Sequence, residues 1–335
     1  KTLRKRGEIM KKKSVAAMLM SAAMVMTLLT GCGLGEKSVT AQEAQPAAEA
    51  GETEAEGAAE TESTAETGTE TAGEGEASAD SAKDISAADV QAIIDRGVLR
   101  VGVKNAVVGF GYQDELTGEY SGMEIDLAEK IAESLGVDVE FTTVTAATRT
   151  ELLDSGDIDC VLATFTITDE RKESWDFSTP YYTDYVTVLV QKDSGIASIN
   201  DLVDKKVGVS SGSTSARSLV AAMVENGVIE GAGFDSETFD PATWTDGISF
   251  AQYDDYPTIS TALSAGEVDA FCVDKSILAV YHTDDRTYIE DKFAPQDYGV
   301  ATVKGSGLSA YVENLITGWL SDGTIAGMIA ENGIE

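Results

Sequence analysis

The sequence predicts an α/β protein built from two similar lobes, and three observations carry this prediction. Apolar strand-like runs alternate with helical periods from residue 98 onward, which favours parallel-rich sheets flanked by helices. Two short segments then recur weakly, 106 and 110 residues further along the chain, as expected of two tandem units. A final strand and helices follow the second unit. If they return to the first lobe, two extended crossings join the lobes as a hinge.

The first lobe begins with the strand "VLRVGV" at 98–103. A helix is predicted over 123–135, because Ile125, Ala128 and Ile131 fall on one face, and Gly136 follows as a stop signal. The segments "VDVEFTTV", "TRTELLDSG" and "DIDCVLATFT" then read as strand, helix and strand.

The second lobe repeats these signals. "KKVGVSS" from Lys205 matches "LRVGVKN" from Leu99, and "ALSAGEVDAFCVDK" from Ala262 matches "LLDSGDIDCVLATF" from Leu152. Ligands of open α/β sheets bind beyond the carboxyl ends of the strands, so we expect a site in the cleft between the lobes. The expected boundaries are 84–188 with 301–335 for the first lobe and 189–300 for the second, with crossings near 186–192 and 298–304.

The N-terminal segment has the pattern of a bacterial export signal. Met10 is the first methionine, and it precedes the basic residues 11–13 and the apolar run 15–29, which is too short to span a bilayer comfortably. The string Leu-Thr-Gly-Cys ending at Cys32 resembles a lipobox. We therefore expect residues 1–32 to be a signal peptide with start at Met10, and Cys32 to carry a lipid.

Residues 33–83 predict a disordered acidic tether. Between residues 38 and 82 there are twelve acidic residues and no basic one, and such a segment cannot bury enough apolar area to order itself. Residues 83–335 carry 44 acidic and 16 basic residues, a formal charge of −28. This charge makes nucleic acid an unfavourable partner.

The cysteines and motifs point to no metal or cofactor. Cys160 and Cys272 lie in apolar strand-like runs assigned to different lobes, so we expect two buried small hydrophobes rather than a disulfide. The chain contains neither a CxxC nor an HExxH pattern, so zinc is not indicated.

Charged residues follow equivalent strands of the two lobes. Arg171 comes after the threonine-rich stretch 164–168, and a guanidinium beside hydroxyls and free amides can receive a carboxylate. Asp274 follows the corresponding strand of the second lobe, where it could alternatively cap the next helix. Opposite charges facing each other across a cleft match the zwitterion of an α-amino acid.

Residues 208–212 spell GxSxG, the pattern of a hydrolase nucleophile at Ser210. His282 is the only histidine of the chain, and its context reads as the exposed end of a helix. The supposed elbow also opens a second small lobe rather than a larger parallel sheet. A turn that presents amides and hydroxyls to an anion is therefore favoured over a serine hydrolase.

At this point the chain resembles the extracytoplasmic solute-binding proteins of polar amino acid ABC importers, over about residues 88–333. The segments "TGEYSGMEIDLAEKIAESLG" and "TFTITDERKESWDFSTPYY" carry the resemblance. Further segments, "VGVKN", "TRTELLDSGDIDCVLATFTITDERK", "YDDYPTISTAL", "VDAFCVDKSIL" and "FAPQDYGV", are most similar to aspartate- and glutamate-binding members. The resemblance implies the periplasmic-binding-protein-like fold.

It also implies roles for ten residues. Arg171 and Thr166, helped by Thr214 and Ser215, would hold the α-carboxylate of the ligand. Asp274 and the carbonyl of Thr164 would hold its α-ammonium. A side-chain carboxylate would face Lys104 and Arg149, with Tyr256 and Tyr298 nearby.

The chain departs from the family pattern in two places. Ala106 and Val108 stand where the family often has Asp and Pro, so packing over the ligand side chain is expected to differ. Residues 230–247 form a longer segment than usual, with Phe239 and Trp244 that could pack on the lobe or rim the cleft.

Together these features predict a monomeric, non-enzymatic receptor for glutamate or aspartate, lipid-anchored on the outer face of the cytoplasmic membrane. Its partners would be an ABC permease and, through it, ATPase subunits. Receptors for glutamine or cystine remain alternatives. A sensory binding module is disfavoured, because no transmembrane or kinase segment follows the second lobe in this sequence.

Overall fold

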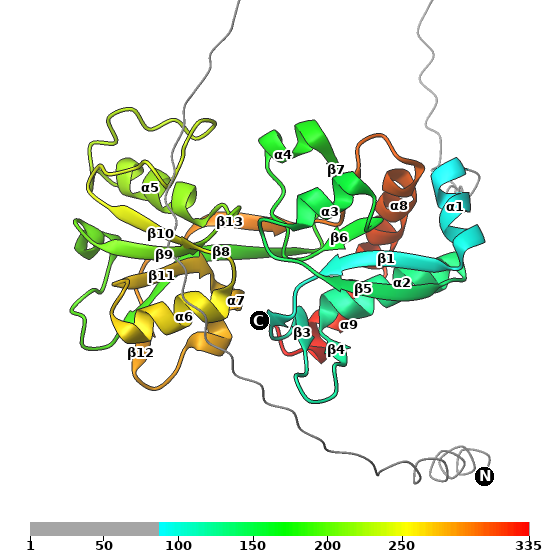
Figure 1. The fold of residues 1–335 in the computed structure, drawn as a ribbon, viewed down its shortest axis with the longest axis horizontal. Helices are drawn as coiled ribbons and strands as arrows, with labels where there is room; N and C mark the ends of the chain where they lie inside the picture. The colour runs from blue at the N-terminus through cyan, green and yellow to red at the C-terminus, as the bar shows by residue number, and fades with distance from the viewer. Residues whose placement is uncertain (1–86, 335) are drawn as a thin grey trace, which may run out of the picture. The chain divides into compact units, whose positions relative to one another are not determined.

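The computed structural model describes residues 87–334. The expected signal peptide, the acidic tether and the expected lipidation site Cys32 lie outside the described residues. Helices flank two main sheets (Figure 1), which confirms the predicted fold class. Across residues 87–334, no helix combines the length and the apolar character that a membrane crossing requires.

Lobe 1 is built on a five-stranded sheet of order β5-β1-β6-β14-β7. Strand β1 is parallel to β5 and β6, whereas β14 is antiparallel to β6 and β7. A small sheet, β2-β3-β4, lies beside it. Its elements are α1 (Ala88–Arg96), β1 (Val98–Val103), β2 (Ala106–Val107), β3 (Gly111–Gln113), β4 (Tyr120–Ser121), α2 (Met123–Leu135), β5 (Asp138–Thr143), α3 (Arg149–Ser155), β6 (Cys160–Leu162), α4 (Asp169–Ser174), β7 (Trp175–Phe177), β14 (Ala301–Val303), α8 (Gly307–Ser321) and α9 (Thr324–Glu331).

Lobe 2 is built on a six-stranded sheet of order β10-β9-β11-β8-β12, with β13 also paired to β8. Strand β9 is parallel to β10 and β11, and β8 is antiparallel to its neighbours. Its elements are β8 (Tyr182–Gln191), η1 (Ile199–Leu202), β9 (Lys206–Ser210), α5 (Ser215–Glu225), β10 (Ser249–Tyr253), α6 (Tyr256–Ala265), β11 (Ala270–Asp274), α7 (Lys275–Leu278), η2 (Ala279–Tyr281), β12 (Arg286–Tyr288) and β13 (Phe293–Tyr298).

The α2 helix illustrates how the sequence specifies an element. It spans Met123–Leu135, and the residues of its apolar face, among them Ile125, Ala128 and Ile131, are buried. Gly136 ends the helix in the left-handed region at φ 72°, a conformation that glycine adopts at little cost. The predicted helix and its stop signal are confirmed.

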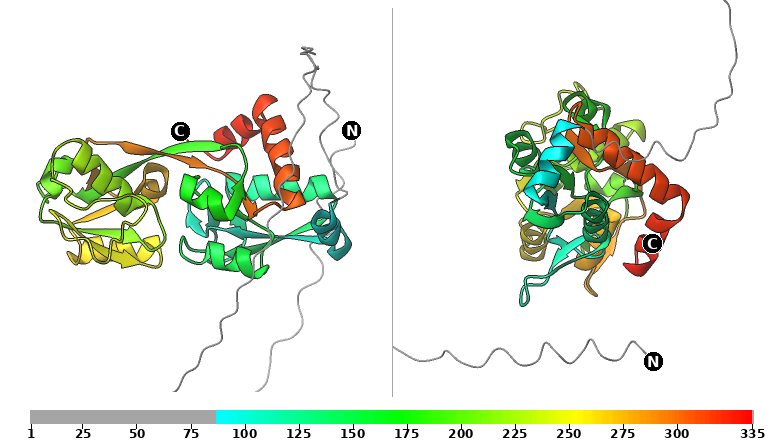
Figure 2. Two further views of the ribbon diagram at one scale, coloured as in Figure 1. Left: turned by 90° about the horizontal axis from the view of Figure 1, so that it is seen from above. Right: turned by 90° about the vertical axis from the view of Figure 1, so that its right-hand side faces the viewer.

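Two chain crossings join the sheets. The first follows β7 and runs along β8, whose residues 182–186 pair with β13 and whose residues 186–190 pair with β11 of lobe 2. It therefore begins N-terminal to the expected range 186–192, and the expected boundary at 188 falls inside β8. The second crossing, between Tyr298 and Ala301, lies within the expected range. Strands β8 and β13 run side by side between the lobes (Figure 2).

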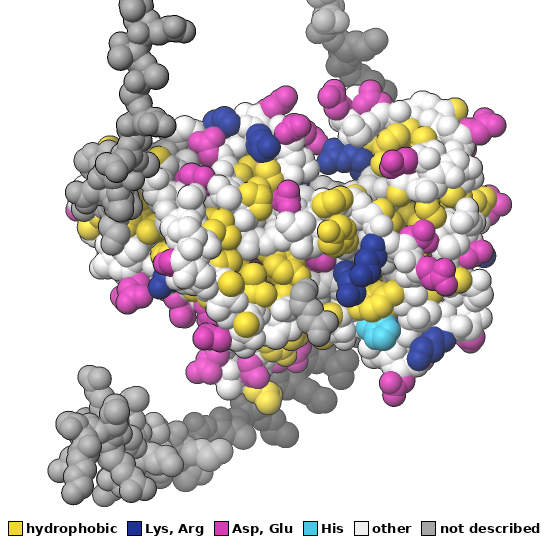
Figure 3. Space-filling model, turned by 180° about the vertical axis from the view of Figure 1, so that it is seen from behind, with side chains coloured by type: hydrophobic (Ala, Val, Ile, Leu, Met, Phe, Trp, Pro, Cys, Tyr) yellow, Lys and Arg dark blue, Asp and Glu magenta, His cyan; other side chains and the backbone are white. Residues whose placement is uncertain are grey.

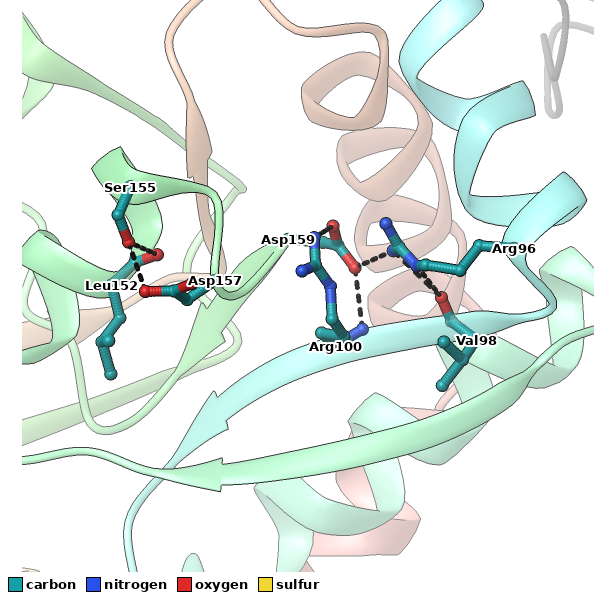
Figure 4. Close-up of polar contacts among 7 residues, drawn as sticks. All are labelled: Arg96, Val98, Arg100, Leu152, Ser155, Asp157 and Asp159. Carbon is teal, nitrogen blue, oxygen red and sulfur yellow. Dashed lines mark hydrogen bonds and ion pairs between the residues drawn. The ribbon is translucent and has the colours of Figure 1, made fainter.

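The weak sequence repeat has a structural counterpart at the start of each sheet. In lobe 1 the backbone N–H of Asp159 donates to the Arg100 carbonyl at 2.8 Å, and its carboxylate accepts from the Arg100 N–H at 2.8 Å (Figure 4). In lobe 2 Asp269 makes the same two bonds with Lys206, both at 2.8 Å. Lobe 1 adds ion pairs from the Arg96 and Arg100 guanidiniums to Asp159. Each aspartate thus locks a helix-to-strand turn onto the first parallel strand.

The glycines inside the repeated Val-Gly-Val strands are also equivalent. A Cβ at Gly102 would lie 2.6 Å from Ile158 Cδ1, and a Cβ at Gly208 would lie 2.6 Å from Ile259 Cγ2 and 3.3 Å from Val268 Cγ2. Ile158 and Val268 occupy matching positions of the repeat. A side chain at Gly208 would displace Ile259 of α6, and one at Gly102 would displace Ile158 and Val144 in the segments beside α3.

We predict that Gly208→Ala lowers the free energy of unfolding by about 1 to 3 kcal/mol, because the branched Ile259 and Val268 side chains have little freedom to move away. Chemical denaturation of the purified protein measures this. Gly318→Ala in α8 is the matched control: no atom lies within 4 Å of its Cβ, so the helix should be stabilised by up to about 1 kcal/mol. Equal stability of the Gly208 variant and the wild type would contradict the close packing.

Cys160 of β6 and Cys272 of β11 are buried free thiols in different sheets. Burial raises the pKa of both thiols. The expectation of two buried small hydrophobes rather than a disulfide is confirmed.

Candidate functional site

The polar residues of interest lie where strands of the two lobes end. Lys104 follows β1 and Thr164 follows β6, whereas Ser210 and Asp274 end β9 and β11. Two cavities, of about 340 and 350 Å³, lie between the lobes at these strand ends, and Ser210 lines both. The expected cleft is therefore present in the structure.

In the second of these cavities, the guanidinium groups of two arginines lie against one aromatic ring. The guanidinium carbons of Arg149 and Arg171 lie 3.8 and 4.7 Å from the centroid of Phe165. Arg149 is only 3% exposed, and burial lowers its pKa to about 10. It donates from Nη1 to the Ala163 carbonyl at 3.0 Å, but its Nε has no partner among the described residues.

Lys104 lies in the first cavity and is also buried. Its Nζ is 5.4 Å from the ring centroid of Tyr256, which belongs to lobe 2. Burial, and next the Arg149 cation, lowers the pKa of Lys104 well below its usual value. An anion bound beside the lysine would favour its charged form.

Glu124 is a buried carboxylate whose negative charge interacts favourably with Lys104 and Arg149. One of its oxygens accepts from the Thr164 N–H at 2.7 Å and from the Tyr181 hydroxyl at 2.6 Å, and the other has no partner among residues 87–334. Burial raises the pKa of Glu124, and Lys104 and Arg149 oppose this rise. Sequence reasoning missed Glu124, although a glutamate on the apolar face of a predicted helix was a usable signal.

Thr164 itself has a strained backbone, with φ 45°, in the left-handed region that threonine rarely adopts. Its N–H is held by Glu124, and its carbonyl lies 3.4 Å from Arg149 Nη1. Strain of this kind persists only where the surroundings enforce it, and it often marks a binding site.

Gln296 of β13 gathers hydroxyls from both lobes. Its Oε1 accepts from Thr166 at 2.9 Å and from Thr214 at 2.7 Å, and its amide group donates to the carbonyls of Ala294 and Pro295. The two threonines were predicted as site residues, but the glutamine between them was missed. No sequence signal distinguished it, because β13 comes from a distant part of the chain.

Arg171 contacts both lobes through its guanidinium. Nη1 donates to the Thr166 carbonyl at 2.7 Å, and Nη2 donates to the Gly212 carbonyl at 3.1 Å. Close to it, α5 begins at Ser215, whose buried hydroxyl has no partner among the described residues. Unpaired hydroxyls, guanidinium N–H groups and a helix N-terminus together form a potential anion receptor.

Asp274 lies opposite these cations in lobe 2. It occupies the N-cap position of α7 but makes no capping bond there; its carboxylate instead accepts from the Tyr298 hydroxyl at 2.5 Å. Tyr298 also donates to Asp184 at 3.3 Å. Burial, reinforced by Asp184, raises the pKa of Asp274 to about 7.

The structure thus brings the predicted residues together at the cleft or directly behind it. Lys104 and Tyr256 line one cavity, and Arg149 and Arg171 line the other. The other six predicted site residues are buried and take part in the hydrogen bonds described above or lie next to residues that do. They are Thr164, Thr166, Thr214, Ser215, Asp274 and Tyr298. Their roles toward a ligand stay predictions.

Ser210 and the histidine are far apart in the fold. His282 is exposed and stacks on Tyr288 of β12, with ring centroids 4.6 Å apart (Figure 3). Strand β12 is three strand spacings from β9, roughly 14 Å at the usual spacing. This arrangement does not form a Ser–His pair.

The aromatic residues of the long segment 230–247 were expected to pack on the lobe or to rim the cleft, and the structure shows both. Phe234, Phe239 and Trp244 pack on one another, and Phe239 also contacts Phe250 of β10. Phe239 and Pro241 line the cavity that contains the two arginines. The segment is therefore packed on lobe 2 and forms one wall of the cleft.

The fold and the cleft are those of a solute-binding protein, and comparison with known proteins gives the family. Residues 99–330 match the bacterial extracellular solute-binding proteins, family 3. The chain belongs to this family.

Individual relatives cover most of the described residues. The chain is 33% identical over 256 residues to the ABC transporter glutamine-binding protein of Bacillus subtilis, covering 74% of this chain and 84% of that protein. It is 32% identical to an L-cystine-binding protein of Escherichia coli, over 69% and 80% of the two chains. Among solved structures, an ancestral arginine-binding protein bound to arginine matches with TM-score 0.59 and 32% identity, over 70% of this chain and 98% of that one.

The raised pKa of Asp274 predicts a pH dependence of stability. Between about pH 4 and pH 7 the folded protein holds a proton at Asp274 that the unfolded chain has lost, so this group makes the protein less stable as pH rises through that window. We expect Asp274→Asn to remove a loss on the order of 2 to 4 kcal/mol. Chemical denaturation of both proteins at pH 4.5 and pH 7.5 measures the difference. A variant with the same pH dependence as the wild type would contradict the assignment.

Proposed function

We propose that the protein is the substrate-binding component of an amino acid ABC importer and that it binds glutamate or aspartate in the cleft. The observation that carries this proposal is a pair of buried cations at the strand ends of lobe 1. Lys104 and Arg149 are both buried, and Glu124 is the buried carboxylate among the described residues of lobe 1, whereas the buried Asp184 and Asp274 belong to lobe 2.

Each charged group of an amino acid ligand can be assigned to a charged residue of the cleft, first for the ligand backbone and then for its side chain. The α-carboxylate of an amino acid would pair with Arg171, and its α-ammonium would pair with Asp274. Glu124 then offsets one of the two remaining cations, and Asp184 accepts from Ser276 and Tyr298 within lobe 2. This leaves one positive charge on the lobe 1 side for the ligand side chain. An unpaired buried charge is costly, so an anionic side chain fits this cleft best.

The donors available at each end support this placement. Arg171 uses two of the five guanidinium N–H groups in its bonds to Thr166 and Gly212. The others can meet a carboxylate together with the Ser215 hydroxyl and the backbone N–H groups of Thr214 and Ser215 at the start of α5. The strained Thr164 carbonyl and Asp274 would accept from the ammonium. Tyr256 and Tyr298 would close the sides of the site.

Lobe closure would follow from the same contacts. The residues proposed for the ammonium belong to both lobes, as do those proposed for the α-carboxylate. A ligand satisfies all of them only when the lobes approach, so binding favours the closed form. We propose that this closed form delivers the amino acid to the permease, and that the protein works as a monomer.

A neutral polar amino acid is the second candidate. The observation that favours it is the burial of Lys104, which disfavours the charged form of the lysine and lowers its pKa. The names of the relatives in Bacillus subtilis and Escherichia coli, which refer to glutamine and cystine, point the same way.

Selectivity measurements on two arginine variants distinguish the candidates. Arg149→Ala should weaken glutamate and aspartate by about thirtyfold to several thousandfold, because their side-chain carboxylate would be buried without its partner. Glutamine and asparagine should lose far less. Isothermal titration with the four amino acids gives the dissociation constants.

The matched control is Arg171→Ala, which should weaken all four ligands, since each has an α-carboxylate. Arg149→Lys should recover part of the preference for acids, because it keeps the charge. If the wild type prefers the amides, or if Arg149→Ala weakens acids and amides equally, the acidic ligand is the wrong choice and the neutral one is favoured.

The lipid anchor is also part of the proposal. We expect Cys32→Ala to move the protein from the membrane fraction to the soluble extracytoplasmic fraction without a change in ligand affinity, because Cys32 lies far along the chain from the cleft residues. Fractionation of cells that produce each form, with titration of the purified proteins, tests both statements. Retention of the variant on membranes would count against lipidation at this residue.

A further inference from the structure

One ion pair connects the lobes outside the residues assigned to the ligand. Among residues 87–334 there are five ion pairs, and four of them lie within lobe 1. The fifth joins Arg217 Nη1 of α5 to Glu170 Oε2 of α4 at 2.8 Å.

The position of this pair ties it to the proposed α-carboxylate receptor. Glu170 is adjacent to Arg171 in α4, and Arg217 lies in the first turn of α5. Arg171 contacts the Gly212 carbonyl just before α5. Two neighbouring residues of α4 therefore hold the same helix N-terminus of the other lobe.

Arg217 also holds the long segment of lobe 2. Its Nη1 donates to the Ser236 carbonyl at 2.9 Å, and Ser236 lies just before Phe239, which lines the cavity with Arg171. One guanidinium thus links α4, α5 and the cleft wall. Its side chain is 24% exposed, and that of Glu170 is 61% exposed.

We propose that the Glu170–Arg217 pair is a positioning device that holds the two halves of the carboxylate receptor together in the ligand-free protein. It touches no part of the ligand. It raises the population of partly closed molecules, so every ligand that uses the receptor binds more tightly by the same factor. The ligand arm of the test rests on the proposed function, whereas the ligand-free arm does not.

The expected size of the effect is modest. A partly exposed ion pair of this kind changes an equilibrium by up to about fivefold, and salt at 1 M should largely remove the effect. A larger effect would mean that the variant has disturbed the receptor itself.

Glu170→Gln is the informative variant, because it removes the ion pair but leaves the bond from Arg217 to Ser236. We expect it to raise the dissociation constants of glutamate, aspartate, glutamine and asparagine by one common factor of about two to five. Selectivity ratios should stay unchanged, unlike those of Arg149→Ala. The matched control is Asp169→Asn, which removes the ion pair with Lys172 inside α4 and should leave all four constants unchanged.

The ligand-free arm measures the distance between lobes directly. Spin labels are placed at exposed Glu129 of α2 and exposed Glu225 of α5, one in each lobe, in the full chain with Cys32 replaced by Ala. Cys160 and Cys272 are buried, so they should not take up the label. Glu170→Gln should broaden the distance distribution of the ligand-free protein. Glu170→Asp, which keeps the carboxylate and the bond from Arg217 to Ser236, should broaden it less than Glu170→Gln.

The proposal is overturned if Glu170→Gln leaves the ligand-free distances as in the wild type, or if Glu170→Asp broadens them as much as Glu170→Gln does. It is also overturned if the dissociation constants shift by different factors for acids and amides. If none of the four amino acids binds to the wild type, the proposed function fails, but the spin-label comparison still decides whether the pair holds the lobes together.

Discussion

The burial of positive charge between the lobes is the constraint on which the rest of the cleft depends. Arg149 and Arg171 lie against the same phenyl ring, and Lys104 is buried close by. Burying such cations is unfavourable unless oxygen atoms surround them. The strand ends meet this demand with the carbonyls of residues 163, 164, 166 and 212 and with the carboxylate of Glu124. The strained backbone of Thr164 is part of the same arrangement, since it directs a carbonyl and an N–H to opposite charges.

The sequence allowed much of this fold to be predicted where local patterns were decisive. Helix α2 was predicted to the residue, because a periodic apolar face and a terminal glycine are local signals. The pairing of β8 with β13, with which the first crossing begins, was not predicted, since it joins residues more than a hundred positions apart. No local pattern encodes such a pairing.

The candidate site divides in the same way. Charged residues directly after strands, such as Arg171 and Asp274, were identified because their place in the chain fixes their place in the sheet. Gln296 was missed, since its importance arises from two hydroxyls of distant segments that meet at one oxygen. The carboxylate of Asp274 also accepts a hydrogen bond from the Tyr298 hydroxyl and makes no capping bond to α7, although its position in the sequence had suggested a helix cap. Competition between partners of this kind is decided in three dimensions.

The return of the chain to lobe 1 has a consequence for the order of assembly. Strand β14 lies inside the five-stranded sheet, and β7 has no other strand partner among the described residues. Lobe 2, by contrast, is one continuous stretch from β8 to β13. A chain that emerges from its N-terminus can therefore complete the second lobe first, whereas the first lobe must keep a gap in its sheet until the last residues arrive. The N-terminal half is then the later part to become native, and a truncation before Ala301 would leave two strand edges of lobe 1 exposed to wrong pairing.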